Sequence, residues 1–298
     1  MKYVTAPTIA IGLLLCAISI RVTGGFAAAA SDQAVNQPDH SLTQALAKGD
    51  QTAVADLLDS KFAWTDADGK TRTKEETLRD LTAFAADNSA DTDVKTLSYG
   101  DLDVLSGTHH DARFVRLWIK RAAGWRAFVD LDTPIPAEAR PASEARTNGG
   151  GSTGDCDNPC RTLPFKPTTR ADKEVLAEWQ KTKVDEWHPD ANDWATHIAD
   201  EFMIINNGSA RDKADRVALA TKQQAAGIGS PGAPILSMNM YDFSNSVVMI
   251  SHHVPYQGGK PYYNVRVFVS RDGHWPLVWS QQTTIQSAAA QPGAHASK

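Results

Sequence analysis

Asp66 is the residue of this sequence whose type and position most suggest chemistry. It ends the stretch Phe62–Asp66, and a turn-forming segment that contains Gly69 follows it. A carboxylate held in an apolar pocket has a raised pKa and can move protons near neutral pH. The alternative is that Asp66, together with Asp68, makes a polar turn after a strand. The residues themselves favour the turn, and both interpretations stay open.

Two histidine pairs, His109–His110 and His252–His253, stand at corresponding places before the last hairpin of each half. Adjacent residues of a strand point to opposite faces, so we expect one histidine of each pair to face inward. An inward histidine could act as a general base or hold a ligand. The alternative is that these are partly exposed strand ends. With Asp66, His109 and His110 are the candidate catalytic residues.

Aromatic and polar side chains on the same predicted strands are candidate ligand contacts. Most large aromatic residues are expected in the core, but a few should face a pocket and favour a flat or apolar molecule. The candidate ligand-binding residues are Trp64, Trp118, Asn206, His252, His253, Asn264, Trp279 and Gln281.

The segment from His188 to Glu201 contains four residues that can ligate metals, which are His188, His197, Asp200 and Glu201. Their spacing matches no zinc motif, such as two histidines four residues apart on a helix. We expect His197, Asp200 and Glu201 to form the polar face of a helix. The sequence therefore predicts no metal site and no cofactor.

Cys156 and Cys160 flank the turn-forming residues Asp157, Asn158 and Pro159. In an oxidising compartment, two thiols at this spacing most simply form a local disulfide. Because the loop that it closes is short, the disulfide is expected to clip a linker rather than to stabilise a core.

An internal repeat organises the elements that must position these residues. The segment 57–78 resembles the segment 197–217, and the predicted hairpin 117–125 resembles the segment 267–275. Apolar residues at three- and four-residue spacing predict helices at the start of each half, and strands are predicted after them. Two copies of one domain, each with helices first and a sheet after them, indicate an α+β fold.

The chain is expected to be divided into five parts. Residues 1–30 are typical of a signal peptide, with Lys2, an apolar run of twelve residues and a cleavage site after Ala30. The first domain is expected over 31–136, a flexible linker over 137–170, the second domain over 171–286 and a disordered tail over 287–298. The signal predicts a periplasmic or secreted protein, and its run is too short for stable membrane insertion.

Charge excludes one class of partner. The whole chain has a formal net charge of -5, and removal of the signal also removes Lys2 and Arg21. The remaining chain is mildly acidic and has no basic stripe for a phosphate backbone, so nucleic acid is not expected as a partner.

The order of elements resembles that of the nuclear transport factor 2-like (NTF2-like) superfamily, in its SnoaL-like, ketosteroid isomerase-like branch. The resemblance rests on the two helices, the strand that ends at Asp66, the helix at Lys74 and the closing hairpin with Trp125. The resemblance covers about residues 40–136 and 171–286. It implies an α+β fold with two tandem cone-shaped domains, each a curved antiparallel sheet wrapped over N-terminal helices.

The resemblance also bears on Asp66. In similar enzymes a carboxylate that shuttles a proton lies at this place, and Ala63 and Gly69 match the surrounding stretch. Two features depart from the enzymes: the first helix offers no tyrosine as an oxyanion donor, and the second copy has Asn206 in place of Asp66.

Three hypotheses of function remain, because a fold alone does not specify a reaction. The first is an exported tandem protein that binds a small, partly apolar molecule in a cone-shaped pocket without catalysis. The second is an isomerase, dehydratase or cyclase that uses Asp66 as proton shuttle. The third is an interaction protein that uses its sheet faces, either as a homodimer or through pairing of its own two domains.

Overall fold

The computed structural model describes residues 1, 27–137, 156–206, 209–229, 232–255 and 259–287. Residues 2–26 of the expected signal peptide, 138–155 of the expected linker and 288–298 of the expected tail lie outside the described part. Among the described residues, no helix combines the length and the apolar content that crossing a membrane requires.

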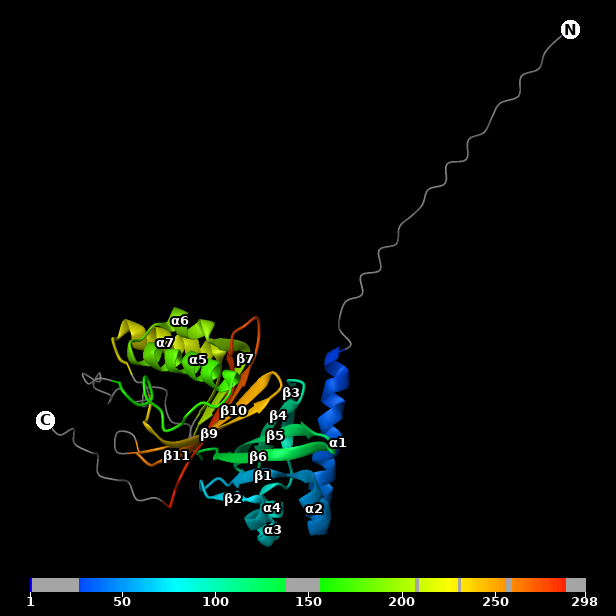
Figure 1. Cartoon of the computed structure of the whole chain (residues 1–298). Coiled ribbons are helices and arrows are strands. Elements are labelled where there is room, and N and C mark those ends of the chain that lie inside the picture. Colours follow the sequence, from blue (N-terminus) through cyan, green and yellow to red (C-terminus); the bar gives the residue numbers. More distant parts are fainter. Residues whose placement is uncertain (2–26, 138–155, 207–208, 230–231, 256–258, 288–298) are drawn as a thin grey trace.

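The first half contains four helices and six strands (Figure 1). They are α1 (Ala27–Lys48), α2 (Gln51–Leu57), β1 (Leu58–Thr65), β2 (Thr71–Thr73), α3 (Lys74–Arg79), α4 (Leu81–Asp87), β3 (Thr92–Ser98), β4 (Leu102–His109), β5 (Ala112–Arg121) and β6 (Gly124–Pro134). The Thr73 hydroxyl accepts from the Glu76 N–H while the Glu76 carboxylate accepts from the Thr73 N–H, and this capping box fixes the start of α3.

The second half repeats this order with three helices and six strands. They are α5 (Arg170–Trp187), α6 (Ala191–Thr196), β7 (Ile198–Asn206), β8 (Ser209–Asp212), α7 (Lys213–Ala225), β9 (Ile235–Phe243), β10 (Ser246–His253), β11 (Tyr262–Val269) and β12 (Leu277–Thr284). A second capping box, between Thr169 and Asp172, begins α5.

The two sheets have the same topology. The strand order is β2-β1-β6-β5-β4-β3 in the first sheet and β8-β7-β12-β11-β10-β9 in the second. The predicted α+β class and the two tandem domains are confirmed. Each sheet is mixed rather than wholly antiparallel, because β1 runs parallel to β6 and β7 runs parallel to β12.

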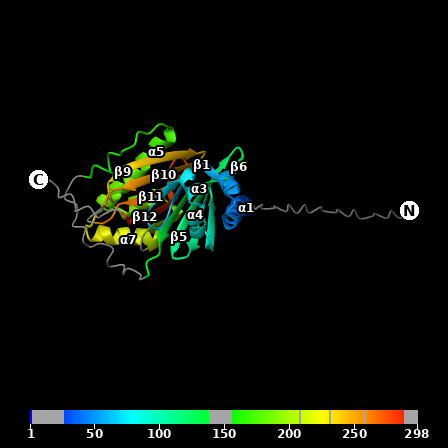
Figure 2. The same cartoon turned by 90° about the horizontal axis from the view of Figure 1, so that it is seen from below.

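The two sheets pack against each other between the two sets of helices. In Figure 1, α5, α6 and α7 lie above the second sheet, and α3 and α4 lie below the first. Seen from below, α3 and α4 lie in front of the strands (Figure 2). The shared core contains Val115, Leu117 and Ile119 of β5 together with Val265 and Val267 of β11. One face of each sheet is therefore covered by the other sheet.

Polar contacts also join the domains. The Gln281 amide nitrogen donates to the carbonyl oxygens of Arg113 and Leu131, at 3.0 and 3.2 Å. The Thr133 hydroxyl donates to the Gln282 carbonyl oxygen at 2.9 Å. These hydrogen bonds pair backbone acceptors that are buried between the sheets. The interface between the two domains therefore contains specific polar contacts as well as apolar packing.

Gly69 allows a close approach between the halves. Its φ is +75°, and a Cβ at this position would lie 2.7 Å from the Thr284 carbonyl oxygen and from the Ile285 Cα. The turn after β1 can therefore lie against the end of β12 only because residue 69 has no side chain.

The predicted helical face at His197, Asp200 and Glu201 is wrong. The helix α6 ends at Thr196, His197 is its C-cap, and Asp200 and Glu201 lie on β7. The apolar residues of β7 alternate irregularly, so the sequence pattern does not separate this short helix from the strand that follows it.

Candidate functional site

We call the side chains enclosed between a sheet and its own helices the interior of that domain. The first interior is centred on Arg116 of β5, which is buried. Its Nε donates to Asp130 at 3.0 Å, and its Nη1 donates to Asp39 at 2.5 Å. Its Nη2 donates to Asn88 and, at 3.4 Å, to Asp91. All three nitrogens of the guanidinium are thus paired within the protein.

His109 joins the same network at the end of β4. Its Nδ1 lies 3.2 Å from Asp91, and its Nε2 lies 2.9 Å from Asp132. Burial alone would lower the pKa of His109, but the hydrogen bonds to Asp132 and Asp91 outweigh burial and raise the pKa to about 10. At neutral pH His109 is therefore an imidazolium between two carboxylates.

Burial acts in the opposite direction on the acids of the first interior. It raises the pKa of Asp130 to about 7 despite the neighbouring Arg116, and it raises the pKa of Asp87 to about 6. The acids around Arg116 and His109 thus act as the counterions of these two cations. Every described N–H donor of Arg116 is paired within the protein, so none is available to a ligand anion.

Asp66 makes the turn after β1. Its Oδ1 accepts from the backbone N–H groups of Asp68 and Lys70, at 3.1 and 2.9 Å, and its Oδ2 accepts from Arg72 at 2.7 Å. Arg72 in turn lies over the Trp64 ring, 4.1 Å from its centroid. These are the contacts of the polar turn, and the role of Asp66 as proton shuttle stays a prediction.

Replacement of Asp66 by asparagine is expected to destabilise the protein by about 1–2 kcal/mol. The amide oxygen can still accept from the turn, but the charged hydrogen bond with Arg72 is lost. Urea unfolding followed by tryptophan fluorescence measures the change. An unfolding free energy equal to that of the native chain would show that the Arg72 pair contributes nothing.

The other residues of the first domain that were predicted as site residues lie partly in the core and partly at the surface. Trp64 and Trp118 are buried in the core next to the helices, and the Trp118 indole nitrogen donates to Asp39 at 3.1 Å. His110 lies outside the strand at a φ of +48° and is exposed, with its Nε2 3.0 Å from the Ser89 hydroxyl. The inward histidine of this pair is thus His109.

Arg266 of β11 occupies the position in the second interior that Arg116 occupies in the first. Arg116 lies opposite Asp130 on the next strand, whereas Arg266 lies opposite Ser280. Its Nη1 donates to the Ser251 hydroxyl at 2.9 Å. Within the part of the chain that the structure describes, no carboxylate lies within 4.0 Å of Arg266. Burial lowers its pKa to about 10, although Tyr262 and the Glu186 carboxylate act in the opposite direction.

Two further cations lie near Arg266 and share one carboxylate. Lys183 of α5 and Arg216 of α7 contact Glu186 at 2.6 and 3.0 Å. Lys183 and Arg266 lie over the Trp179 ring, 5.5 and 5.1 Å from its centroid. Three cations therefore face one anion in this described cluster, and its electrostatic potential is positive.

His253 and Asn264 border the same cluster. His253 is buried, and its Nε2 lies 2.9 Å from the Ser251 hydroxyl. Burial and the charge of Arg266 hold the pKa of His253 well below its usual range, so the ring is neutral. The Asn264 side chain donates to Ser280 at 3.3 Å, and its buried Oδ1 has no hydrogen-bond partner in the described structure.

The remaining predicted ligand residues do not join this cluster. Trp279 belongs to the core between the sheets, and the Gln281 side chain donates a hydrogen bond to the Arg113 carbonyl oxygen of the first domain. His252 lies on the opposite strand face from His253 and stacks near Tyr263. Asn206 is the last residue of β7 and accepts from the Ser209 hydroxyl of β8 at 2.9 Å. Alternation along the strands thus separates residues that are neighbours in sequence.

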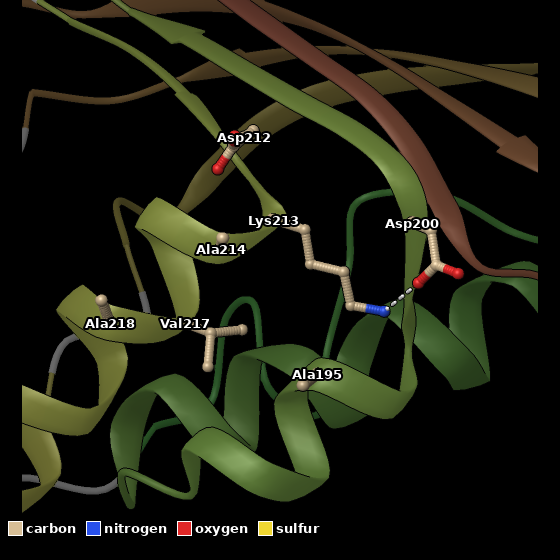
Figure 3. A pocket seen from close by; sticks show the side chains of 7 residues that line it. All are labelled: Ala195, Asp200, Asp212, Lys213, Ala214, Val217 and Ala218. Carbon is tan, nitrogen blue, oxygen red and sulfur yellow. Dashed lines mark hydrogen bonds and ion pairs between the residues drawn. The ribbon is translucent and has the colours of Figure 1, made fainter.

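A surface hollow of about 680 Å³ lies outside the second sheet, between α6, α7 and β7 (Figure 3). Lys213 crosses it and pairs with Asp200 at 2.9 Å and with the Ile198 carbonyl oxygen at 2.7 Å. Ala195, Ala214, Val217 and Ala218 provide most of the remaining lining, and Asp212 completes it. Because Asp200 already neutralises Lys213, this hollow is a weaker site for an anionic ligand than the cluster around Arg266.

Apart from His109, the charged residues of both interiors were missed by sequence reasoning. One signal was available: Arg116 and Arg266 stand at matching positions, each with apolar residues directly before and after it in its strand. An arginine in the middle of such a strand needs a partner or a ligand. The residues of α1, α5 and α7 that lie near these two arginines are far away in sequence, and no sequence pattern points to them.

No protein-family model and no curated protein matches this sequence. Solved structures that are similar to it each cover about one domain. A protein of the NTF2-like family from Streptomyces avermitilis is 14% identical over 37% of this chain and 99% of its own, with a TM-score of 0.32. An NTF2-like protein from Cytophaga hutchinsonii is 15% identical over 40% of this chain and 100% of its own, with a TM-score of 0.34. An NTF2-like protein of unknown function in nutrient uptake, from Rhodospirillum rubrum, is 20% identical over 34% of this chain and 98% of its own, with a TM-score of 0.28.

Proposed function

We propose that this chain, a tandem pair of NTF2-like domains, binds a small organic anion in the interior of its second domain. The observation that carries the proposal is Arg266, which is 6% exposed, donates to the Ser251 hydroxyl and has no carboxylate within 4.0 Å among the described residues. The signal expected over residues 1–30 would deliver the protein to the periplasm or outside the cell, where it would bind the anion without transforming it.

The cost of burying an unpaired charge is the physical argument. Removing an ion from water costs several kcal/mol unless a counterion and hydrogen bonds replace the lost hydration. Arg116 has these replacements from its own domain, whereas Arg266 has one described hydrogen bond to a neutral hydroxyl. A ligand carboxylate could supply the missing charge, as Asp130 does for Arg116.

The surroundings of Arg266 indicate the class of ligand. Lys183 and Arg216 add positive charge, and the rings of Trp179 and Trp194 lie beside these cations. Flat apolar rings next to cations favour a ligand with an aromatic body and an anionic group. We therefore propose an aromatic carboxylate, with its carboxylate toward Arg266.

The test is thermal unfolding of the native chain with millimolar benzoate and indole-3-acetate, compared with R266M and with R113M as a matched control. Arg113 is a partly exposed arginine on β5, outside the second interior. An anion that binds only the folded state raises its stability, by about 2.7 kcal/mol at one hundred times Kd. We expect the melting temperatures of the native chain and of R113M to rise and that of R266M to stay unchanged.

The ligand-free state gives an independent readout. R266M is expected to be at least as stable as the native chain, because methionine fills similar space without a buried charge. Equal ligand-induced shifts in the native chain and in R266M would place binding elsewhere. The absence of any shift with either carboxylate would contradict the proposal.

A further inference from the structure

Three side chains of the second domain converge outside its interior, at the junction of α5, α6 and β7. Asp185 lies on α5, Asp193 lies on α6 and His197 follows α6. One ligating atom from each lies within 4.8 Å of the other two. The His197 Nε2 is 4.0 Å from the Asp185 Oδ2 and 3.9 Å from the Asp193 Oδ2.

Two of these atoms are buried and have no hydrogen-bond partner in the described structure, namely the His197 Nε2 and the Asp185 Oδ2. His197 itself is 7% exposed. Distances of 3.9 and 4.0 Å exceed the usual range of an N–H···O hydrogen bond. The two buried atoms therefore lie close together without a bond between them.

The other ring nitrogen of His197 determines which atom of the ring faces the two aspartates. Its Nδ1 contacts the Glu178 carboxylate, and the nitrogen is the only group of that pair that can donate a proton. In the neutral imidazole, the Nε2 then presents a lone pair, and two carboxylates face it. Lone pairs that converge in this way repel each other unless a proton or a metal ion lies between them.

We propose that Asp185, Asp193 and His197 bind a divalent transition-metal ion, with Zn²⁺ as the best fit. Imidazole nitrogens and carboxylate oxygens are both among the ligands that zinc takes in proteins, and imidazole favours a transition metal over Mg²⁺ or Ca²⁺. Glu178 orients the imidazole, as the carboxylate partners of metal-bound histidines do. The site is separate from Arg266 and does not depend on the proposed anion binding.

The surroundings leave a coordination position open. Asp185 and Asp193 line a surface hollow of about 310 Å³ together with Cys160 and Val184. Ligand atoms about 2.0–2.2 Å from zinc lie roughly 3.3 Å apart in a tetrahedral site. The His197 Nε2 must therefore move closer to each aspartate oxygen by roughly 0.6–0.7 Å, and the two aspartate oxygens, which lie within 4.8 Å of each other, must move closer by up to about 1.5 Å. The Asp193 side chain, which is 59% exposed, is free to move.

The experiment is calorimetric titration of ZnCl₂ into the full chain, without an affinity tag and with the cysteines oxidised. The variants are D193N and H197Q, and H188Q is the matched control because His188 is an exposed histidine at the end of α5. We expect one Zn²⁺ per chain for the native protein and for H188Q, at least tenfold weaker binding by D193N and no binding by H197Q.

D193N keeps the test decisive if H197Q fails to fold, because Asp193 is exposed and its replacement preserves shape. A melting temperature that rises with Zn²⁺ in the native chain but not in the folded D193N variant would support the site through a second readout. Equal zinc affinity of the native chain and D193N, or no zinc binding at millimolar concentration, would overturn the proposal.

Discussion

Replacement of Arg116 by methionine is expected to lower the free energy of unfolding by about 3–5 kcal/mol. The guanidinium contacts Asp39, Asp91 and Asp130, and removing it leaves these acids without their shared counterion. The loss from an uncompensated buried charge exceeds the energy of any single contact. Urea unfolding at pH 7, followed by tryptophan fluorescence, measures the change.

The control for this replacement is R113M, which removes a partly exposed arginine from the same strand and is expected to change stability by less than about 0.5 kcal/mol. A loss below about 1 kcal/mol in R116M would show that the acids of the first interior accept protons or water at little cost. The network would then be a weak structural element, and its interior would be open to ligands.

Raising the pH from 6 to 10 is expected to destabilise the first domain. The pKa of His109 is raised from 6.5 to about 10 in the folded state, so its contribution is fully present below pH 6.5 and is lost as the pH rises through 10. Its full shift corresponds to at most about 4–5 kcal/mol, and coupling to Asp91 and Asp132 reduces the expected loss to roughly 2–4 kcal/mol.

The other groups that face His109 act mainly below this window. The raised pKa values of Asp87 and Asp130, about 6 and about 7, mean that the folded state retains their protons longer than the unfolded chain. Their effect is also a loss of stability with rising pH, but it falls between about pH 4 and 7. Arg116 stays charged throughout, so it does not contribute to the slope.

The measurement is the urea unfolding free energy of the native chain and of H109Q at several pH values between 6 and 10. The difference between the two curves reports the titration of His109 together with the shifts that its charge causes in Asp91 and Asp132. We expect the advantage of the native chain to decrease with rising pH. A difference that stays constant across the window would show that His109 does not titrate there.

The fold could be predicted from the sequence because it depends on local patterns that occur twice. Phe62 and Phe202, on the first long strand of each sheet, mark the duplication, and both are buried against helices. The starts of α3 and α5 also depend on local residues, since Thr73 and Thr169 both form capping boxes in the structure. A duplicated domain can be recognised from its repeated order of elements even where each local sequence pattern is weak.

The candidate sites could be predicted only in part, because they are made by contacts across the fold. Arg116 meets Asp39, which lies 77 positions earlier in the chain. The sequence places His197 among residues able to ligate a metal but predicts no metal site, and it does not point to Asp185, because the two side chains come together only when α6 folds back on α5. Strand alternation also divides residues such as His252 and His253 between two faces.

The packing of one sheet on the other has a consequence for how the protein behaves on dilution. Val115, Leu117, Val265 and Val267 meet within one polypeptide, so the association of the two halves is unimolecular. Two separate chains that met through the same face would dissociate below their Kd, whereas linked halves remain together at any concentration. The pairing is thus governed by effective molarity and not by the amount of protein made.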